Sequence, residues 1–406
     1  MTIEQSAPPV WAGHTRGSTA YGRLLVALFC AGVATFAQLY SPQAVLPLIS
    51  ADLHIGAAAA ALTISASTVG LAIGVIPWST LADRIGRVRA ISLSVTVATA
   101  VGLLVPFAPT YQLLLAGRFV EGLVIGGVPA IAIAYLTEEI EPAHAARAAG
   151  TFVAGTTIGG LLGRLVSSPV AEIAGWRIGV FTVAVLCGLA AVSFVKLAPQ
   201  PQGFVPSNQS GANPEGSLAH RLVVNLHSPR QLALFAQGFL LMGGFVALYN
   251  FLGFRLTAAP FFLPQFVVSL VFAAYLAGTW ASSRAGAEAT RFGRKPVLLV
   301  SVAIMAAGVA ITLSTNVFVV LAGLLIATAG FFGAHSIAAG WTGQSAPAGK
   351  AQASSLYNLF YYGGSSVFGW FGGVAYDGRG WPALAATILA LTVIAAVAAA
   401  VILPEN

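Results

Sequence analysis

Apolar and polar positions alternate along the chain in long blocks. Apolar stretches of about 20 residues recur from residue 22 onward, and each is long enough to cross the hydrocarbon core of a bilayer as a helix. Six spans are predicted in the first half of the sequence, at 22–47, 58–81, 89–108, 112–136, 147–169 and 177–197. Six more are predicted at 231–255, 264–284, 296–314, 317–341, 352–374 and 383–403. The pattern predicts an all-α polytopic membrane protein with twelve transmembrane helices.

Two polar segments divide this pattern. Residues 1–21 lack the hydrophobic region of a cleavable signal, and we expect a disordered cytoplasmic tail there. Residues 198–230 are rich in Pro, Gly, Ser and Asn, which is typical of a linker, and their stretch SLAHRLVVNLHS predicts a short amphipathic helix on the membrane surface. We therefore expect two six-helix bundles, 22–197 and 231–406, of which the second ends in a short cytoplasmic tail.

Charge is scarce, and its placement predicts the orientation of the chain. Only 8% of the residues are charged, against about 25% in soluble proteins, and the net charge is +7. With the N-terminus in the cytoplasm, most of the 19 Lys and Arg residues fall on the cytoplasmic side, as the positive-inside rule requires. These are Arg16, Arg23, Arg84, Arg87, Arg89, Arg147, Lys196, Arg221, Arg230, Arg284, Arg291, Arg294, Lys295 and Lys350. The positive charge therefore indicates topology, with both termini cytoplasmic, and we expect no nucleic-acid partner.

The two halves of the sequence repeat one another. RIGR at 84–87 corresponds to RFGR at 291–294, an offset of 207, and Gly175-Trp176 corresponds to Gly380-Trp381, an offset of 205. Landmarks in the same order at nearly constant offset indicate two parallel six-helix repeats. Such repeats place a binding site between the halves, near the middle of the membrane.

The turn between spans 2 and 3 carries a family resemblance. STLADRIGRVR at 79–89 resembles the cytoplasmic loop motif of the major facilitator superfamily, roughly GxLADRxGR, with Ser79 in place of the first glycine. YLTEEI at 135–140, FLLMGGFVALYNFLGFRL at 239–256 and AQASSLY at 351–357 resemble its drug, sugar and metabolite exporters. The resemblance covers essentially the whole chain. It implies two pseudo-symmetric six-helix bundles in a bacterial inner membrane, a monomer, no cofactor, and alternating access by a rocker switch.

The same turn has a physical interpretation. Gly86 permits a tight connection, whereas Arg84 and Arg87 keep the loop out of the lipid. Asp83 can accept hydrogen bonds from arginine or from a helix start. The resemblance implies that this cluster latches the halves together in the outward-facing state, and the alternative is a simple topology anchor. The second copy has Thr290 where the acid would be, so we expect it to act as an anchor.

Glu121 is the only carboxylate clearly inside a predicted span. It follows Arg118 by three residues, so the two side chains share a helix face and can pair. RFVEGLVIGG at 118–127 resembles the span-4 motif of the superfamily, in which the arginine serves proton coupling. Burial favours a protonated glutamate and a nearby arginine favours the charged form, so movement of Arg118 would load and release a proton. The alternative is a static ion pair that fixes packing.

His335, in span 10, is the third candidate for proton coupling. A histidine titrates near neutral pH when unperturbed, so a proton relay is one interpretation. The other is a histidine that is hydrogen-bonded to a neighbouring helix.

Span 5 combines glycines with an arginine. Gly155, Gly159 and Gly160 resemble the exporter-associated GPxxGG motif without its proline, and we expect them to pack closely against span 8. Arg164, together with Arg118 and Arg255, would make the cavity electropositive and favour an anionic or polyhydroxylated solute. The alternative, which we prefer for Arg255, is that Arg164 and Arg255 extend to the outer membrane interface.

Polar and aromatic side chains cluster in the spans that line the cavity in this family. Aromatic rings stack on sugars or other rings and amides form hydrogen bonds, so these residues are candidate substrate contacts. Tyrosines are also common where a helix meets the membrane interface, which is the alternative for the tyrosines. Besides Arg164, the candidates are Gln38, Tyr40, Gln43, Tyr249, Asn250, Tyr357, Asn358, Tyr361 and Tyr362.

The sequence favours transport over catalysis. HExxH, GxSxG, a Cys/His cluster and the phosphate-binding GxxxxGK[ST] loop are all absent, so we expect no enzyme, no ATP-driven pump and no metal site. We predict proton-coupled efflux of a small organic solute such as a drug, a sugar or an anionic metabolite. The alternative is a proton-coupled or facilitative importer of a sugar or an organic acid, because direction is not written in the sequence.

Overall fold

The computed structural model describes residues 11–204 and 217–405, and these are almost entirely helical. We call α1 to α8 the first half and α10 to α15 the second half. The elements of the first half are α1 (Thr19–Tyr40), η1 (Ser41–Val45), α2 (Leu46–Leu53), α3 (Ala57–Ile85), α4 (Arg87–Leu104), η2 (Val105–Phe107), α5 (Tyr111–Ile125), α6 (Gly127–Glu139), α7 (Pro142–Ala174) and α8 (Trp176–Leu197). Those that follow are α9 (Leu218–Leu226), α10 (Pro229–Thr257), α11 (Gln265–Leu270), η4 (Val271–Ala274), α12 (Tyr275–Phe292), α13 (Arg294–Ile311), α14 (Val317–Gln344) and α15 (Lys350–Ile402).

The helices agree with the twelve predicted spans. Over the described residues, 11 helical stretches are long and apolar enough to cross a membrane. The last of them, α15, has 53 residues and contains two of the predicted spans. Its backbone leaves helical geometry at Arg379 and Gly380, which lie between these two spans. The protein is therefore a polytopic helical membrane protein, as the sequence predicts.

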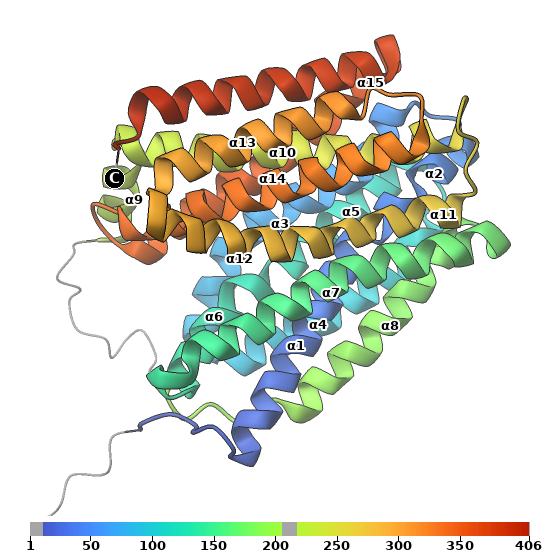
Figure 1. Cartoon of the computed structure of the whole chain (residues 1–406). Helices are drawn as coiled ribbons and strands as arrows, with labels where there is room; N and C mark the ends of the chain where they lie inside the picture. The colour runs from blue at the N-terminus through green and yellow to red at the C-terminus, as the bar shows by residue number, and fades with distance from the viewer. Residues whose placement is uncertain (1–10, 205–216, 406) are drawn as a thin grey trace, which may run out of the picture.

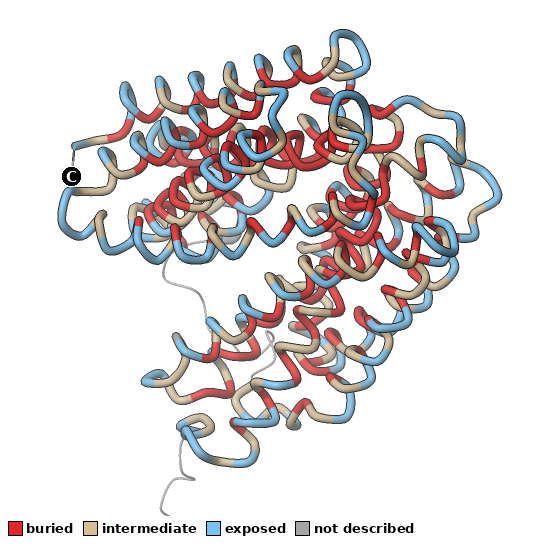
Figure 2. Tube along the Cα trace, turned by 45° about the vertical axis from the view of Figure 1, so that its right-hand side comes forward, coloured by how far each residue is buried: buried red, intermediate tan, exposed pale blue. Residues whose placement is uncertain are grey.

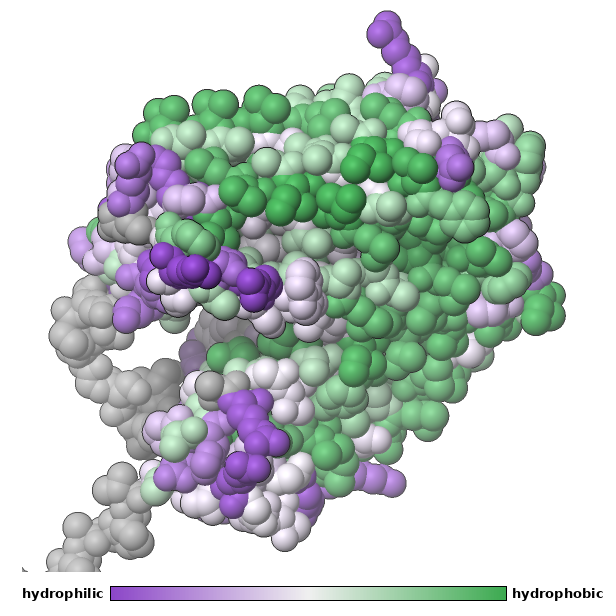
Figure 3. Space-filling view, viewed as in Figure 1, coloured by the Kyte–Doolittle hydropathy of each residue, from purple (hydrophilic) through white to green (hydrophobic). Residues whose placement is uncertain are grey.

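The two halves approach each other at one end of the molecule and diverge at the other (Figure 1). The diverging end carries the first described residues, α9 and the C-terminal end of α15, and we call it the linker side. The opposite end is called the far side. Figure 3 shows the surface hollowed between the halves on the linker side, with hydrophilic residues on both rims. The structure is therefore open toward the linker side.

The sequence repeat has a counterpart in the backbone. Gly86 and Gly293 have φ angles of 93° and 87°, and Gly175 and Gly380 have φ angles of 85° and 69°. These left-handed conformations strain a residue with a side chain, so glycine is required where one span turns directly into the next. The matched pairs therefore make the same turn in each half.

Buried residues follow the helix faces that look toward neighbouring helices (Figure 2). Large apolar side chains also cover the outside, for example Ile173, Leu104 and Val401, which are 90%, 73% and 78% exposed. Such exposure suits a surface that contacts lipid, where apolar side chains lose nothing by facing outward. Close packing between the helices then depends on small residues.

The N-terminal segment corrects one prediction. We expected a disordered tail over residues 1–21, but residues 11–18 lie against the end of α6. The Trp11 indole donates to the Glu138 carbonyl at 3.2 Å, and the His14 amide donates to the Glu139 carbonyl at 2.7 Å. These bonds fix the segment, so the prediction is wrong for residues 11–18, whereas residues 1–10 lie outside the described residues.

The glycines of span 5 correct a second prediction, because they face α1 rather than span 8. A Cβ atom on Gly159 would lie 2.6 Å from the Cα atom of Val33, and one on Gly155 would lie 2.9 Å from the Cα atom of Phe29. The side of α7 that faces span 8 instead carries polar contacts made by Arg164 and Ser168. The glycines therefore allow a close crossing inside the first half.

The linker segment contains the helix α9. Ser217 caps its start, accepting the His220 amide at 3.2 Å, and the Asn225 side chain donates to the Ala348 carbonyl at 2.5 Å. The helix is thereby attached to the connection between α14 and α15. Its position on the membrane surface stays a prediction.

Candidate functional site

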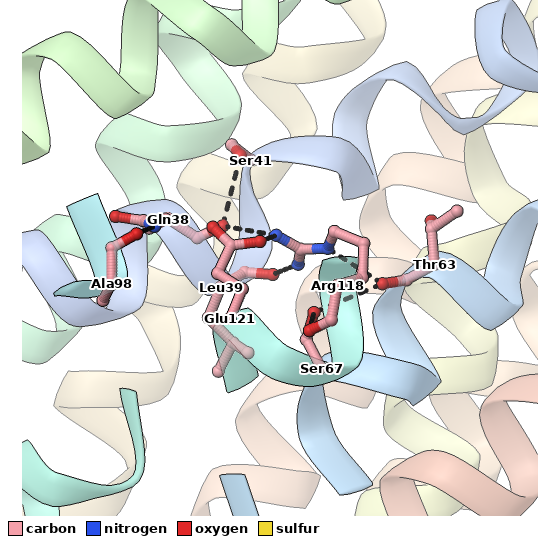
Figure 4. Close-up of polar contacts among 8 residues, drawn as sticks. All are labelled: Gln38, Leu39, Ser41, Thr63, Ser67, Ala98, Arg118 and Glu121. Carbon is pink, nitrogen blue, oxygen red and sulfur yellow. Dashed lines mark hydrogen bonds and ion pairs between the residues drawn. The ribbon is translucent and has the colours of Figure 1, made fainter. Parts of the chain in front are cut away.

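A buried ion pair lies inside the first half (Figure 4). Arg118 and Glu121, both on α5, are each 1% exposed. The Arg118 Nη1 atom lies 2.5 Å from the Glu121 Oε2 atom. Glu121 faces neighbouring helices and is thus shielded from lipid.

Arg118 also donates hydrogen bonds to backbone carbonyls at the end of α1, where a break interrupts the helix of the first span. The Gln38 carbonyl lacks its usual helical donor, because that donor would be the amide of Pro42, which has no N–H. Arg118 Nη1 donates to this carbonyl at 3.3 Å, and Nη2 donates to the Leu39 carbonyl at 2.6 Å. Its Nε atom donates to the Thr63 carbonyl at 3.0 Å. One side chain therefore connects α1, α3 and α5.

The side chain of Gln38 belongs to the surroundings of this ion pair. Its Nε2 atom donates to the Ala98 carbonyl on α4 at 2.5 Å, as Figure 4 shows. A Cβ atom on Gly102 would meet both the Gln38 amide and Glu121 Oε1. The amide nitrogen of Gln38 is therefore bonded inside the first half in this conformation, and the role of Gln38 as a substrate contact stays a prediction.

Arg164 forms a second centre, at the interface between the halves. It lies on α7, is 2% exposed, and has its guanidinium carbon 4.5 Å from the centre of the Tyr40 ring. The rings of Phe272 and Tyr275, from the second half, lie at 4.8 Å each. Three aromatic faces therefore stabilise the cation. We call Arg164 and these three rings the aromatic box.

The sequence missed half of the aromatic box. Phe272 and Tyr275 belong to no motif, and the only signal was an aromatic pair in the middle of span 8. Their contact with Arg164 joins segments that lie more than a hundred residues apart in the chain.

A chain of hydrogen bonds continues from the aromatic box across the interface. Arg164 Nε donates to Gln43 Oε1 at 2.7 Å, and Gln43 Nε2 donates to Asn250 Oδ1 at 2.6 Å. Arg164 Nη1 donates to the Gly160 carbonyl at 2.7 Å, and Nη2 lies 3.4 Å from the Tyr275 hydroxyl. The structure thus brings together four predicted residues, namely Tyr40, Gln43, Arg164 and Asn250.

Tyr249 lies one layer behind the box. Its hydroxyl is hydrogen-bonded to Thr328 Oγ1 at 2.7 Å, and its ring centre lies 4.9 Å from that of Tyr275. The side chain is 1% exposed, so it supports Tyr275 and is itself covered in this conformation.

His335 is bonded to a neighbouring helix. Its Nδ1 atom lies 2.9 Å from the Tyr357 hydroxyl, and its ring centre lies 4.8 Å from that of Tyr361. No carboxylate forms an ion pair with it among the described residues. This arrangement matches the second interpretation of His335, and its role in proton coupling stays a prediction.

Three other candidates share one face of α15. Asn358 is exposed, and Tyr361 and Tyr362 are half-buried with ring centres 5.2 Å apart. Residues three and four apart on a helix lie side by side, so these side chains form one accessible surface.

Arg255 lies away from the box. Both terminal nitrogens of its guanidinium donate to carbonyls just beyond the end of α13, those of Thr312 and Ser314. Because Arg118 is paired with Glu121, Arg164 is the one arginine of the three that adds unpaired positive charge at the interface.

The loop motif forms its cluster within the first half. Arg87 Nη1 lies 2.5 Å from Asp83 Oδ1, and Nη2 lies 2.8 Å from Glu138 Oε1. Arg84 is exposed. Glu138, which sequence reasoning missed although it lies in the YLTEEI stretch, is the main acceptor. Among the described residues the side chain of Arg87 bonds only to Asp83 and Glu138 of the first half, which fits the separation of the halves on the linker side.

On the far side, Asp377 bridges the halves. Its Oδ1 and Oδ2 atoms accept hydrogen bonds from the amides of Ala57 and Ala58, at 3.1 and 3.0 Å. A carboxylate on α15 thereby caps the first turn of α3, where helix N–H groups and the helix dipole favour negative charge. The far side is also joined by Glu172, which accepts the Phe266 amide at 3.2 Å.

We expect Asp377→Ala to favour the state in which the far side is open. Loss of the cap should cost the closed state about 1 kcal/mol, which changes the ratio of the two states about fivefold. Spin labels at Ala174 and Thr315, on opposite halves, should show a larger long-distance fraction by double electron–electron resonance.

The matched control is Glu288→Ala, which removes a carboxylate paired with Arg284 on the same helix. It should leave the distance distribution unchanged. Cys30 and Cys187, both free, are replaced by alanine in all samples. An Asp377→Ala distribution identical to that of the parent would contradict a role for the cap in closure.

Comparisons with known proteins agree with this architecture. The family model of the Major Facilitator Superfamily matches residues 24–289. The chain is 39% identical to the inner membrane transport protein YnfM of Escherichia coli over 94% of this chain and 90% of that protein. It is 34% identical to the uncharacterized MFS-type transporter YybF of Bacillus subtilis, over 90% of each chain.

Two solved structures share the fold. A mutant form of the nucleoside transporter NupG has a TM-score of 0.77 at 13% identity and covers 94% of this chain and 100% of its own. A bacterial homologue of the human lysosomal transporter Spinster has a TM-score of 0.74 at 17% identity, with 95% of this chain and 96% of its own covered.

Proposed function

Since the chain belongs to the Major Facilitator Superfamily and is a multi-pass membrane transporter, we propose that it exports a small organic solute in exchange for protons. In this proposal the linker side faces the cytoplasm, where the positive-inside rule puts most of its Lys and Arg residues. The described conformation is then the cytoplasm-open state of a rocker switch.

The observation that carries the proposal is the path from the ion pair to the aromatic box. Arg118 holds the carbonyls of Gln38 and Leu39 while it pairs with Glu121. The next residue, Tyr40, covers Arg164. A proton on Glu121 would remove the negative partner of Arg118 and change its hold on α1. Proton binding and solute binding therefore act on the same break in α1.

The order of events follows from the same contact. In the proposed cycle the pairing of Glu121 with Arg118 belongs to the charged carboxylate, so in the cytoplasm-open state the proton has left and the solute can enter. After the halves rock, protonation of Glu121 from outside accompanies release of the solute. Because Glu121 is 1% exposed in the described state, the proton must both leave it and reach it in other conformations of the cycle.

We expect Glu121→Gln to abolish the response of transport to a pH gradient. Glutamine keeps the shape of the side chain but cannot exchange a proton. A survey of toxic compounds and sugars for changed tolerance on overexpression identifies the solute. Its flux is then measured in proteoliposomes with an imposed pH gradient, and Glu288→Gln, on an exposed pair, is the control.

Each outcome has a distinct meaning. Movement of the solute in the direction opposite to the protons supports export by antiport. Movement of the solute in the same direction as the protons indicates an importer. Equal accumulation in wild type and Glu121→Gln would rule out Glu121 as the coupling site. Absence of any effect of the gradient on wild type would rule out proton coupling.

A further inference from the structure

We propose that Arg164, Gln43 and Asn250 bind the oxyanion group of the transported solute, and that the solute is an organic anion with an aromatic or apolar body. This inference rests on the proposed function only in that the bound anion is taken to be transported. The binding site itself is argued from the contacts at the interface between the halves.

The first argument is charge. Arg164 is 2% exposed, and it forms no ion pair with any carboxylate of the described residues. Its neighbours are three aromatic rings, a carbonyl, an amide oxygen and a hydroxyl. A buried cation normally has an anionic partner, as Arg118 has Glu121. The interface is therefore positive, which favours an anion and disfavours a cation.

The second argument is the direction of the hydrogen bonds. A guanidinium can only donate, so the Gln43 oxygen accepts from Arg164 and the Gln43 amide nitrogen must donate to Asn250 Oδ1. This leaves Asn250 Nδ2 as a donor, and it has no partner among the described residues although Asn250 is 1% exposed. An unpaired buried donor is unfavourable, and an acceptor-rich ligand would satisfy it.

The guanidinium of Arg164 has more N–H donors than it has protein acceptors. It has five N–H groups, of which three have protein partners, and the bond to Tyr275 is long at 3.4 Å. Two N–H groups remain, and a planar carboxylate or a phosphate accepts two parallel bonds from such a fork. Surplus donors on both Arg164 and Asn250, with no acid to receive them, point to an oxyanion.

The walls of the site indicate the rest of the solute. Tyr40 and Tyr275 flank Arg164, while Tyr361 and Tyr362 are half-buried on α15. Tyr275 is likewise only half-buried, so Tyr275, Tyr361 and Tyr362 keep accessible faces, whereas Tyr40 is buried. Aromatic faces pack against apolar and aromatic bodies, so a small aromatic carboxylate matches both parts of the site.

The test measures thermal unfolding of the purified full-length protein in detergent with matched probes. Benzoate is compared with benzamide, which has the same shape without the charge, and with phenyl phosphate, benzenesulfonate and benzyltrimethylammonium. A ligand that binds the folded state raises the melting temperature with its concentration. We expect at least one of the oxyanions to raise it, and benzamide and the cation to have no effect.

The variants assign the effect to the site. Arg164→Gln should raise the oxyanion concentration at half-saturation at least tenfold. Asn250→Asp, which is isosteric but negative, should do the same. Arg164→Lys keeps the charge without the fork and should be intermediate. Arg284→Gln, at an exposed ion pair on α12, is the control and should bind as wild type does.

Three results would overturn the proposal. They are equal shifts with benzoate and benzamide, an oxyanion shift unchanged in both Arg164→Gln and Asn250→Asp, and no shift with any of the three oxyanions. If Arg164→Gln does not fold, as judged by gel filtration, the result with Asn250→Asp decides.

Two further results separate the binding site from the proposed function. Oxyanion binding without gradient-driven flux would refute the proposed function but not the binding site. Gradient-driven flux of a neutral solute, unaffected by Arg164→Gln, would refute the site and leave the function.

Discussion

Replacement of Arg118 by methionine is expected to lower the free energy of unfolding by about 3–5 kcal/mol, because it leaves Glu121 buried without a partner. Methionine fills a similar volume, so the loss arises from the charge and from the carbonyls of Gln38, Leu39 and Thr63, which lose their donor. The measurement is reversible unfolding in mixed micelles of mild detergent and SDS.

A double variant separates the two contributions. Arg118→Met combined with Glu121→Gln removes the unpaired charge but not the loss of the carbonyl donor, so it should regain part of the stability. Arg284→Met, at the exposed pair with Glu288, should change stability by less than about 0.5 kcal/mol. If the double variant is no more stable than Arg118→Met, the unpaired charge of Glu121 is not a cause of the lost stability, and the ion pair does not serve to balance that charge.

The positions of the spans could be predicted from the sequence because the bilayer imposes one strong rule. Every backbone polar group in the hydrocarbon must be bonded within a helix, so apolar length alone marks each span. The turns were equally readable, since Gly86 and Gly293 occupy conformations that exclude other residues. Arg118 and Glu121 could be paired because both lie on one helix, three residues apart.

The rotation of each helix about its axis could not be read in the same way. Spans that are apolar all round give no preferred face, so neighbours are decided by contacts between distant segments. Gln38 and Tyr40 illustrate this, because residues two apart on a helix lie about 200° apart. Gln38 therefore bonds to α4 while Tyr40 covers Arg164, although both had the same predicted role. Asp377 was missed because its partner, the start of α3, lies in the other half.

Substitution of Gly159 by alanine is expected to lower the free energy of unfolding by about 1–3 kcal/mol through overpacking. The added Cβ atom would lie 2.6 Å from both the Cα and the carbonyl oxygen of Val33, and backbone atoms cannot move aside as a flexible side chain would. The helices α1 and α7 must then separate. The measurement is again unfolding in mixed micelles, with the melting temperature as a second readout.

A matched control lies on the same helix. Gly150 has no atom within 4 Å of its ideal Cβ position, so Gly150→Ala should raise stability by about 0.5–1 kcal/mol through better helix propensity. Separation of α1 from α7 also reaches the aromatic box, because Tyr40 is on α1 and Arg164 is on α7. Gly159→Ala should therefore weaken oxyanion binding while Gly150→Ala leaves it intact. Equal effects of the two substitutions on stability would contradict the close crossing of α1 and α7.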